Sequence, residues 1–320
     1  MFSIRQYEPD QDLLRLHQLL TAVEAHDQDG EEVSEEALRQ QLTWNNYDPR
    51  LDSWVIEDPD KLGELIGYAS VAGRAGGRCT VYTAVHPDWR RRGLGTRLLD
   101  QALERGKETG ADHFIVYANA QNDSAIAFLR RRGYEPVGAS WILSASAAQA
   151  FAEPVWPPGF RVHSFAEVED FAILAEISNR SYGDMWGHSQ NEQPATPEGI
   201  SEMGPAYWPP ESVFLAFAPD GDAVGLCLGI PGESVNVIDS PGVAPEYRHL
   251  ELQRPLLLTV ARHLQSEQPK DIQLLSYGDD AQTISIYQDI GFCLDAHYIA
   301  YHGELEEKVQ GTIKDSVQVH

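Results

Sequence analysis

The chain has 320 residues, a length that suits two domains of about 150 residues each. Hydrophobic residues make up 42% of it, which is enough for ordinary buried cores, and no stretch approaches the roughly 20 apolar residues of a membrane span. The formal net charge of -25 at pH 7 predicts a surface that repels nucleic acid and anionic membranes and attracts cations such as amines. An acidic surface that serves only solubility is the alternative.

The N-terminus and the cysteines both bear on where the protein acts. The first 12 residues lack the basic stretch and apolar run of a signal peptide. Cys79, Cys227 and Cys293 are far apart, which favours small buried residues over a disulfide framework or a zinc site. We therefore expect a cytoplasmic protein without a bound metal.

The first half of the chain alternates strands and helices. Its patterns predict, in chain order, a strand at 4–7, helices at 13–25 and 35–44, strands at 53–57, 65–71 and 80–85, a helix at 95–110, a strand at 113–117, a helix at 124–132 and a strand near 141–143. The helix at 95–110 has the clearest pattern, because Leu98, Leu99, Ala102 and Leu103 share one face. Gly133 is placed to end the predicted helix at 124–132.

A linker separates this half from a second one. The stretch from Ser144 to Gly159 is rich first in small residues and then in proline. The same order then resumes, with a strand at 160–163, a helix at 168–182, strands at 213–217, 223–228 and 235–243, a helix at 253–265, a strand at 272–277, a helix at 281–290 and a strand after Gly291. These patterns predict an N-terminal domain (1–146), a linker (147–159), a C-terminal domain (160–305) and a tail (306–320).

The two halves are copies of one unit. Landmarks in separate elements are each 158 residues apart: Ile4 and Val162, Val85 and Val243, and Gly133 and Gly291. The segments RRRGYEPVG and YQDIGFCLD are recognisably the same helix end. A shared offset in three elements favours duplication over coincidence.

The segment from Val85 to Thr96, VHPDWRRRGLGT, has the features of an anion site. It joins a predicted strand to a predicted helix, and Gly93 and Gly95 let the backbone approach a ligand closely. The N–H groups and the dipole at the start of the helix favour a diphosphate, and the three arginines are a basic island in an acidic chain. The segment lacks the lysine of a P-loop and the first glycine of a dinucleotide fingerprint. An arginine-rich turn that merely starts a helix is the alternative.

The sequence VHPDWRRRGLGTRLL resembles the acetyl-CoA-binding motif of the GNAT (GCN5-related N-acetyltransferase) superfamily, and NDSAIAFLRRRGY resembles the next motif of that family. The two-copy layout is similar to that of mycothiol synthase and related tandem GNAT proteins. The resemblance implies an α/β (α+β) chain made of two tandem GNAT folds. Each would be a mixed, mostly antiparallel, splayed sheet flanked by helices.

The resemblance also implies an acetyl-CoA or coenzyme A site in the first copy. The main chain of Thr83, Ala84 and Val85 would pair with the pantetheine arm, and Asn122 would bond the pantetheine or adenosine end. The main-chain N–H groups of the loop would hold the pyrophosphate. The loop residues assigned to the cofactor are Arg90, Arg91, Arg92, Gly93, Leu94, Gly95 and Thr96.

The second copy departs from the cofactor motif at three positions: Glu251 stands for Gly93, Gln253 for Gly95 and Asp280 for Asn122. A carboxylate a few ångströms from a pyrophosphate costs about 1 kcal/mol or more, and the replacement of glycine would also remove its backbone geometry. We therefore expect that the second copy does not bind coenzyme A in the usual way. It would instead cover the first copy and line a substrate cleft.

The candidate catalytic residues are found in both copies. The family often has a tyrosine that protonates the leaving thiolate, and that position holds Leu129 in the first copy and Tyr287 in the second. Tyr82 and Tyr117 are alternative donors in the first copy, or else aromatic residues of the core or cleft. The candidate bases are Glu57, at a strand end expected to face the splayed region, and Glu24 and His26, with surface positions as the alternative.

The acceptor would contact aromatic residues. The segment 181–208 reads as a long, loop-rich insertion that either walls an amine pocket or packs between the domains. The candidate substrate contacts are Trp44, Tyr182, Trp186 and Tyr207.

The resemblance implies an N-acetyltransferase that transfers an acetyl or short acyl group to the primary amine of a small molecule by direct attack on the thioester. The alternatives are a non-catalytic sensor of acyl-CoA and a protein or peptide N-acetyltransferase. We expect a monomer or homodimer, with no nucleic-acid or membrane partner.

Overall fold

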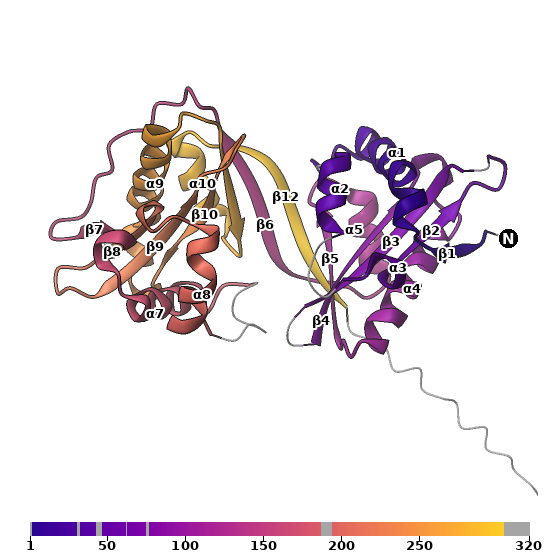
Figure 1. Cartoon of the computed structure of the whole chain (residues 1–320), viewed down its shortest axis with the longest axis horizontal. Helices are drawn as coiled ribbons and strands as arrows, with labels where there is room; N and C mark the ends of the chain where they lie inside the picture. Colours follow the sequence, from indigo (N-terminus) through magenta and orange to yellow (C-terminus); the bar gives the residue numbers. More distant parts are fainter. Residues whose placement is uncertain are drawn as a thin grey trace, which may run out of the picture.

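The computed structural model describes residues 2–30, 33–42, 47–61, 63–74, 77–186 and 194–303. These residues form two lobes of similar design, joined by two long strands that run side by side between them (Figure 1). Helices flank a mixed, mostly antiparallel sheet, as the sequence predicts; among the described strands, parallel pairing occurs at β4–β5 and β10–β11.

The N-terminal lobe follows the predicted order. Its elements are β1 (Ile4–Gln6), α1 (Pro9–Asp27), α2 (Glu35–Gln41), α3 (Pro49–Asp52), β2 (Ser53–Glu57), β3 (Leu65–Arg74), β4 (Arg78–Val85), α4 (Leu94–Glu108), β5 (His113–Asn119), α5 (Asp123–Arg131) and β6 (Glu135–Ala145). Alternation along the strands buries both faces of the sheet. In β2, Val55 belongs to the core beneath α1, whereas Ile56 belongs to the core beneath α4. The predicted apolar face of α4 is buried, with Leu98 and Leu99 fully inaccessible.

The C-terminal lobe repeats this order. Its elements are β7 (Arg161–Ser164), α6 (Phe165–Val168), α7 (Phe171–Tyr182), α8 (Pro197–Tyr207), β8 (Val213–Phe217), β9 (Ala223–Ile230), β10 (Asn236–Val243), α9 (Gln253–Glu267), β11 (Ile272–Tyr277), α10 (Ala281–Ile290) and β12 (Cys293–Gly303). The offset of the repeat recurs in the backbone. Gly133 and Gly291 both follow a helix end, with φ of 78° and 118°.

Four details differ from the expectations. The helix predicted at 168–182 is interrupted, because Glu169 ends α6 with φ of 50° and the side chain of Asp170 caps α7. The insertion predicted to be loop-rich contains α8, which starts at Pro197 under a Thr196 cap. The short helix α3 was not predicted. Cys79 and Cys227 are buried as expected, but Cys293 is exposed.

The two lobes exchange their last strands. The strand order is β1-β2-β3-β4-β5-β12-β6-β11-β10-β9-β8-β7. Strand β12, from the C-terminal half, therefore lies beside β5, and strand β6, from the N-terminal half, lies beside β11. One sheet therefore runs through both lobes and does not stop at the predicted domain boundaries, residues 146 and 160. Each lobe needs a strand from the other half to cover its edge.

Candidate active site

Strands β4 and β5 start side by side and then diverge. Their parallel pairing runs from Arg78 to Thr80 of β4, whereas β4 stays paired with β3 as far as Val85. Main-chain groups of β4 beyond Thr80 therefore face a gap instead of a neighbouring strand. The gap opens into a cavity of about 720 Å³ lined by both strands, including the three residues assigned to the pantetheine arm, Thr83, Ala84 and Val85.

The predicted anion loop borders the same cavity. Gly93 caps α4 with φ of 80°, and a Cβ atom there would meet nothing within 4 Å, so the glycine serves the backbone conformation and not a close approach of neighbours. The first main-chain bond of α4 runs from the N–H of Arg97 to the carbonyl of Gly93. The N–H groups of Leu94, Gly95 and Thr96 precede that bond and lie beside the cavity.

The arginines of the loop have different positions. Arg90 and Arg91 line the cavity, but the guanidinium of Arg92 lies over the ring of Trp89, 4.5 Å from its centroid, and Arg92 is not among the cavity-lining residues. Arg131, at the end of α5, lines the cavity although it was not predicted to do so. Its signal in the sequence is the basic run RRRGY at the end of the second motif.

Arg90 ties the loop to α1. Its Nε donates to the carbonyl of Val85 at 3.0 Å, and its two terminal nitrogens donate to the carboxylate of Asp27 at 2.7 Å each. Burial acts to raise the pKa of Asp27, but the bonds from Arg90 and His26 hold it below its ordinary value. Arg90 is therefore engaged by a carboxylate and shapes the loop, in addition to lining the cavity.

Asn122 caps α5 and also contacts the segment that follows α1. Its Oδ1 accepts from the N–H of Ala125 at 3.1 Å, and its Nδ2 donates to the carboxylate of Asp29 at 3.0 Å. Asp29 lines the cavity, and burial raises the pKa of its carboxyl group. Asp29 was not predicted, because it lies in the segment after α1, where no motif marks it.

The C-terminal lobe holds Asp29 in place. The hydroxyl of Tyr298 in β12 donates to the main-chain carbonyl of Asp29 at 2.8 Å, and Nδ2 of Asn119 donates to the same carbonyl at 2.7 Å. Tyr298 and Tyr277, both from the second half of the chain, line the cavity together with Ser140 of β6. Strand exchange thus makes the far wall of this cavity from elements that follow the first copy in sequence.

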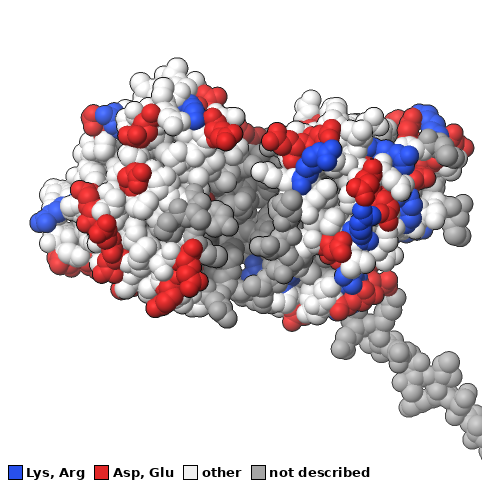
Figure 2. All heavy atoms as spheres, in the orientation of Figure 1, with Lys and Arg blue, Asp and Glu red and all other residues white. Residues whose placement is uncertain are grey.

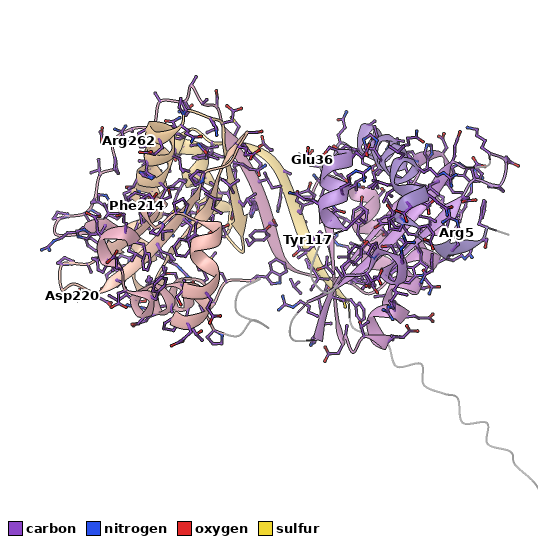
Figure 3. The ribbon with its side chains drawn as sticks, viewed as in Figure 1. Arg5, Glu36, Tyr117, Phe214, Asp220 and Arg262 are labelled. Carbon is purple, nitrogen blue, oxygen red and sulfur yellow. The ribbon has the colours of Figure 1, made fainter. Side chains whose placement is uncertain are left out.

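The four proposed catalytic side chains are not brought together. Tyr82 and Tyr117 line the cavity, and Tyr117 lies at the side of the N-terminal lobe that faces the C-terminal lobe (Figure 3). Glu57 does not face the gap as expected; it accepts from Nε of Arg5 at 3.1 Å on the opposite side of β2 and β3. Tyr287 is fully buried in the C-terminal core and donates to Asp279 at 3.1 Å. Of the other two candidate bases, Glu24 lines the cavity, whereas His26 is exposed and pairs with Asp27 at 2.8 Å.

The aromatic residues proposed to contact the acceptor also separate. Trp44 and the side chain of Tyr207 lie outside the described residues. Trp186 packs on β6, where a Cβ atom on Gly138 would fall 2.1 Å from its ring, and its ring centroid is 6.1 Å from that of Tyr117. Tyr182 lines a second, smaller pocket in the C-terminal lobe.

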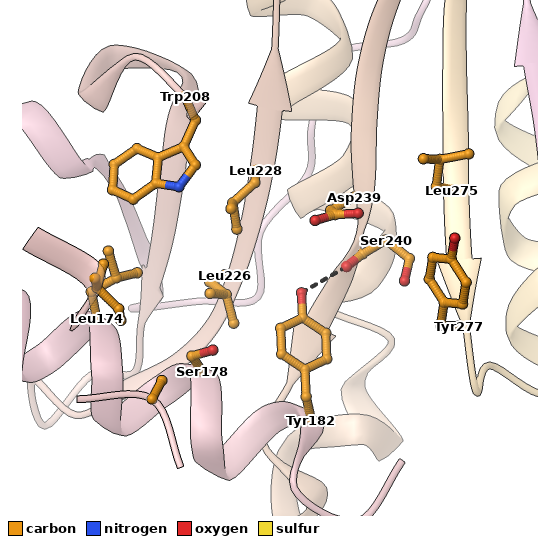
Figure 4. Close-up of a pocket in the computed structure, with 12 residues that line it drawn as sticks. Leu174, Ser178, Tyr182, Trp208, Leu226, Leu228, Asp239, Ser240, Leu275 and Tyr277 are labelled. Atoms are coloured by element: carbon orange, nitrogen blue, oxygen red, sulfur yellow. Dashed lines mark hydrogen bonds between the residues drawn. The ribbon is translucent and has the colours of Figure 1, made fainter. Parts of the chain in front are cut away.

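The counterpart of the cavity in the C-terminal lobe is largely filled. The hydroxyl of Tyr182 donates to the carbonyl of Ser240 at 2.8 Å, and Ser240 is the counterpart of Tyr82 on the open strand edge (Figure 4). The expectation that the loop loses its glycine geometry is wrong, because Glu251 has φ of 50° and keeps the left-handed conformation of Gly93. What the second loop has instead is a carboxylate at that position. The pocket that remains measures about 230 Å³.

Two further properties concern the described residues as a whole. Within the described ranges, no helix has both the length and the apolar character that crossing a membrane requires. The same ranges contain no group of three or more His, Cys, Asp or Glu side chains placed to hold a metal ion.

Residues 16–134 match the acetyltransferase (GNAT) family. Among curated proteins, the chain is 29% identical over 241 residues to the mycothiol acetyltransferase of Saccharomonospora viridis, covering 72% of this chain and 76% of that protein. It is 23% identical over 256 residues to the mycothiol acetyltransferase of Saccharopolyspora erythraea, covering 76% and 83%.

Solved structures show the same architecture over nearly the whole chain. The GCN5-related N-acetyltransferase of Sphaerobacter thermophilus superposes with a TM-score of 0.78 at 25% identity and covers 95% of both chains. A tandem GNAT protein from the clavulanic acid biosynthesis pathway gives a TM-score of 0.64 at 14% identity, covering 95% of this chain and 98% of that one. Residues 16–134 thus match the GNAT acetyltransferase family, and the chain as a whole has the two-copy fold seen in a solved tandem GNAT protein.

Proposed function

We propose that the protein transfers an acetyl group from acetyl-CoA, bound in the N-terminal domain, to the primary amine of a small molecule. The observation that carries the proposal is the gap between β4 and β5, which leads from the edge of β4 beyond its ladder with β5 to the start of α4. An extended amide-containing arm fits the edge, and a diphosphate fits the N–H groups of Leu94, Gly95 and Thr96. Arg91 and Arg131 add positive charge on the same cavity.

Acetyl-CoA would supply an activated thioester that the amine attacks directly, without a covalent enzyme intermediate. The main chain of Thr83, Ala84 and Val85 would hold the pantetheine arm, and Asn122 would bond it from the other side. The acidic residues Glu24 and Asp29 on the α1 side of the cavity would attract an ammonium ion and accept its proton. Tyr82 and Tyr117 are the hydroxyl groups on the cavity that would protonate the departing thiolate.

Because curated relatives are named mycothiol acetyltransferase, small molecules are the class of acceptor to test first. The cavity of about 720 Å³ is within the range of small-molecule sites, which suits the cofactor. The net charge of -25 also favours a cationic acceptor.

One observation favours a second function, the sensing of acyl-CoA without catalysis. Leu129 occupies the position of the family's usual proton donor, and it is 3% exposed on the cavity wall. A leucine cannot protonate a thiolate. A sensor releases no thiolate and needs no proton donor, so a leucine at this position is compatible with sensing.

The test is to mix the protein with acetyl-CoA and a panel of primary amines and to follow the release of free thiol. A transferase releases thiol with at least one amine of the panel, in an amount equal to the acetylated product. Acetyl-CoA binding at one site per chain without thiol release across the panel would support the sensor, and absence of binding would reject both functions.

A further inference from the structure

One row of side chains crosses four strands beneath the two cavities. Asn119 of β5, Tyr298 of β12, Ser140 of β6 and Tyr277 of β11 are successive partners in the ladders. Directly opposite residues share a face of the sheet, so the four form a continuous floor. All four line the N-terminal cavity, and Tyr277 lines the C-terminal pocket as well.

The C-terminal pocket is small and mainly apolar. It lies between α7, α8 and strands β9 to β11, and its walls include Leu174, Leu226, Leu228 and Trp208 (Figure 4). Asp239 is the charged residue among the described residues that line it. A volume of about 230 Å³ suits a group of the size of a benzene ring and a few methylenes, and a carboxylate on the wall disfavours an anion.

This pocket does not suit the cofactor. Tyr182 already bonds the carbonyl of Ser240, and its ring packs on the strand so closely that a Cβ atom on Gly242 would lie 2.6 Å from it. The strand edge that receives an extended arm in the N-terminal lobe is therefore occupied by a side chain of the protein. The apolar space above it is left for another ligand.

We infer that the C-terminal pocket is a distal subsite of the acceptor, which lies along the row from Asn119 to Tyr277 with its amine in the N-terminal cavity. This inference rests on the proposed acetyl transfer to an amine. The row spans three strand spacings, or about 14 Å. The acceptor class is therefore an elongated primary amine whose far end is an uncharged apolar group. In the view of Figure 2, the surface is hollowed between the two lobes.

The experiment compares two probes, propylamine and 6-phenylhexylamine, on the wild-type protein and on Leu228→Phe, which adds bulk to the pocket wall. Leu294→Phe is the matched control, because Leu294 is 40% exposed on β12 and lines neither cavity. Ser178→Leu fills the pocket from α7 and serves as a second variant if Leu228→Phe does not fold. Binding is measured by calorimetry on the CoA-loaded protein, and kcat/KM by thiol release.

Wild-type protein is expected to bind the phenyl amine at least tenfold more tightly than propylamine. The pocket variants should lose that preference while their affinity for propylamine stays within twofold, and Leu294→Phe should behave as wild type. Equal affinity of the wild type for both amines overturns the inference, as does equal weakening of both amines in the pocket variants.

Failure of the proposed function has a different signature. In that case neither amine releases thiol, although the binding comparison still reports on the pocket. Thiol release from propylamine with no preference for the phenyl amine would leave acetyl transfer in place and reject the distal subsite alone.

Discussion

Gly93 and Glu251 show that charge, and not backbone shape, separates the two loops. They are 158 residues apart and both have a left-handed backbone, with φ of 80° and 50°. A Cβ atom at Gly93 would meet nothing within 4 Å, and Gly93 lines the cavity. A glutamate at that position would therefore place its carboxylate where the proposed diphosphate binds.

Gly93→Glu is expected to weaken coenzyme A binding at least 100-fold, measured by calorimetric titration. Two unit charges 4 Å apart repel by about 4 kcal/mol at an effective dielectric constant of 20, which exceeds that loss. Gly93→Gln is the matched control, since it has the same shape without the charge, and it should lose about tenfold or less. Equal losses in both variants would mean that glycine geometry matters and charge does not.

Asp27 and Asp29 face the cavity two residues apart with opposite pKa shifts. Burial raises the pKa of Asp29, so the stability that this carboxyl group contributes is fully present below its unfolded pKa, near 3.8, and is lost as the pH rises through the higher folded value. For Asp27 burial acts upward, but Arg90 holds the pKa low, so its contribution is present above the unfolded value and is lost in acid.

At pH 7, Asp29→Asn should therefore raise the Tm and Asp27→Asn should lower it. The difference for Asp29→Asn should shrink as the pH is lowered toward 4, whereas the difference for Asp27→Asn should shrink at lower pH, as the pH falls through the depressed folded pKa of Asp27. If Asp29 accepts the proton of the amine, Asp29→Asn should also reduce kcat/KM at least tenfold and flatten its rise with pH. A Tm that falls in Asp29→Asn would show that the bond from Asn122 outweighs the cost of burying the charge.

At the scale of elements, both copies tie the loop after the fourth strand to the preceding helical segment in the same way. Arg90 donates to the carbonyl of Val85 and to Asp27, and Arg248 donates to the carbonyl of Val243 at 3.1 Å and to Asp184 at 2.6 and 2.7 Å. The connection made by Arg248 is thus retained in the copy whose loop carries Glu251. Its role in the fold is therefore separable from cofactor binding.

Arg90→Ala and Arg248→Ala form a matched pair for this idea. Each should lower the free energy of unfolding by about 2 kcal/mol, because each loses charge-assisted hydrogen bonds that are partly shielded from water. Only Arg90→Ala should also weaken coenzyme A binding, which denaturant unfolding and titration together would establish. Weakened binding in Arg248→Ala would place cofactor contacts in the C-terminal lobe.

For the whole molecule, strand exchange makes the two lobes interdependent. β12 covers β5 over six ladder positions and brings Tyr298 onto Asp29, so the N-terminal cavity is complete only when the C-terminal half is present. The same exchange gives β11 its neighbour β6.

A fragment of residues 1–146 is therefore expected to bind coenzyme A at least tenfold more weakly than the whole chain, because β5 loses its neighbour and Asp29 loses a donor. Mixing it with a fragment of residues 147–320 should restore binding, as followed by titration and by size-exclusion chromatography. Full affinity in the isolated N-terminal fragment would show that the exchanged strand is not needed for the site.

The sequence by itself determined the repeat, most of the helices and strands, and the loop around Gly93, because these depend on local periodicity and on backbone conformations that few residues adopt. Leu98 and Leu99 mark a helix face wherever the helix packs, and Gly133 ends a helix by its own geometry. The helix α8 was missed because glycine, proline and aromatic residues in its segment resemble a loop.

Only the tertiary structure decided how the lobes share strands and which side chains meet. Exchange of β6 and β12 leaves each strand's own pattern unchanged, so no local signal distinguishes it from pairing within a lobe. Asp29, Tyr277 and Tyr298 line one cavity although they come from segments up to 269 residues apart. Glu57, which was expected to face that cavity, instead pairs with Arg5. Such contacts arise from the packing of distant elements, and spacing along the chain carries no record of them.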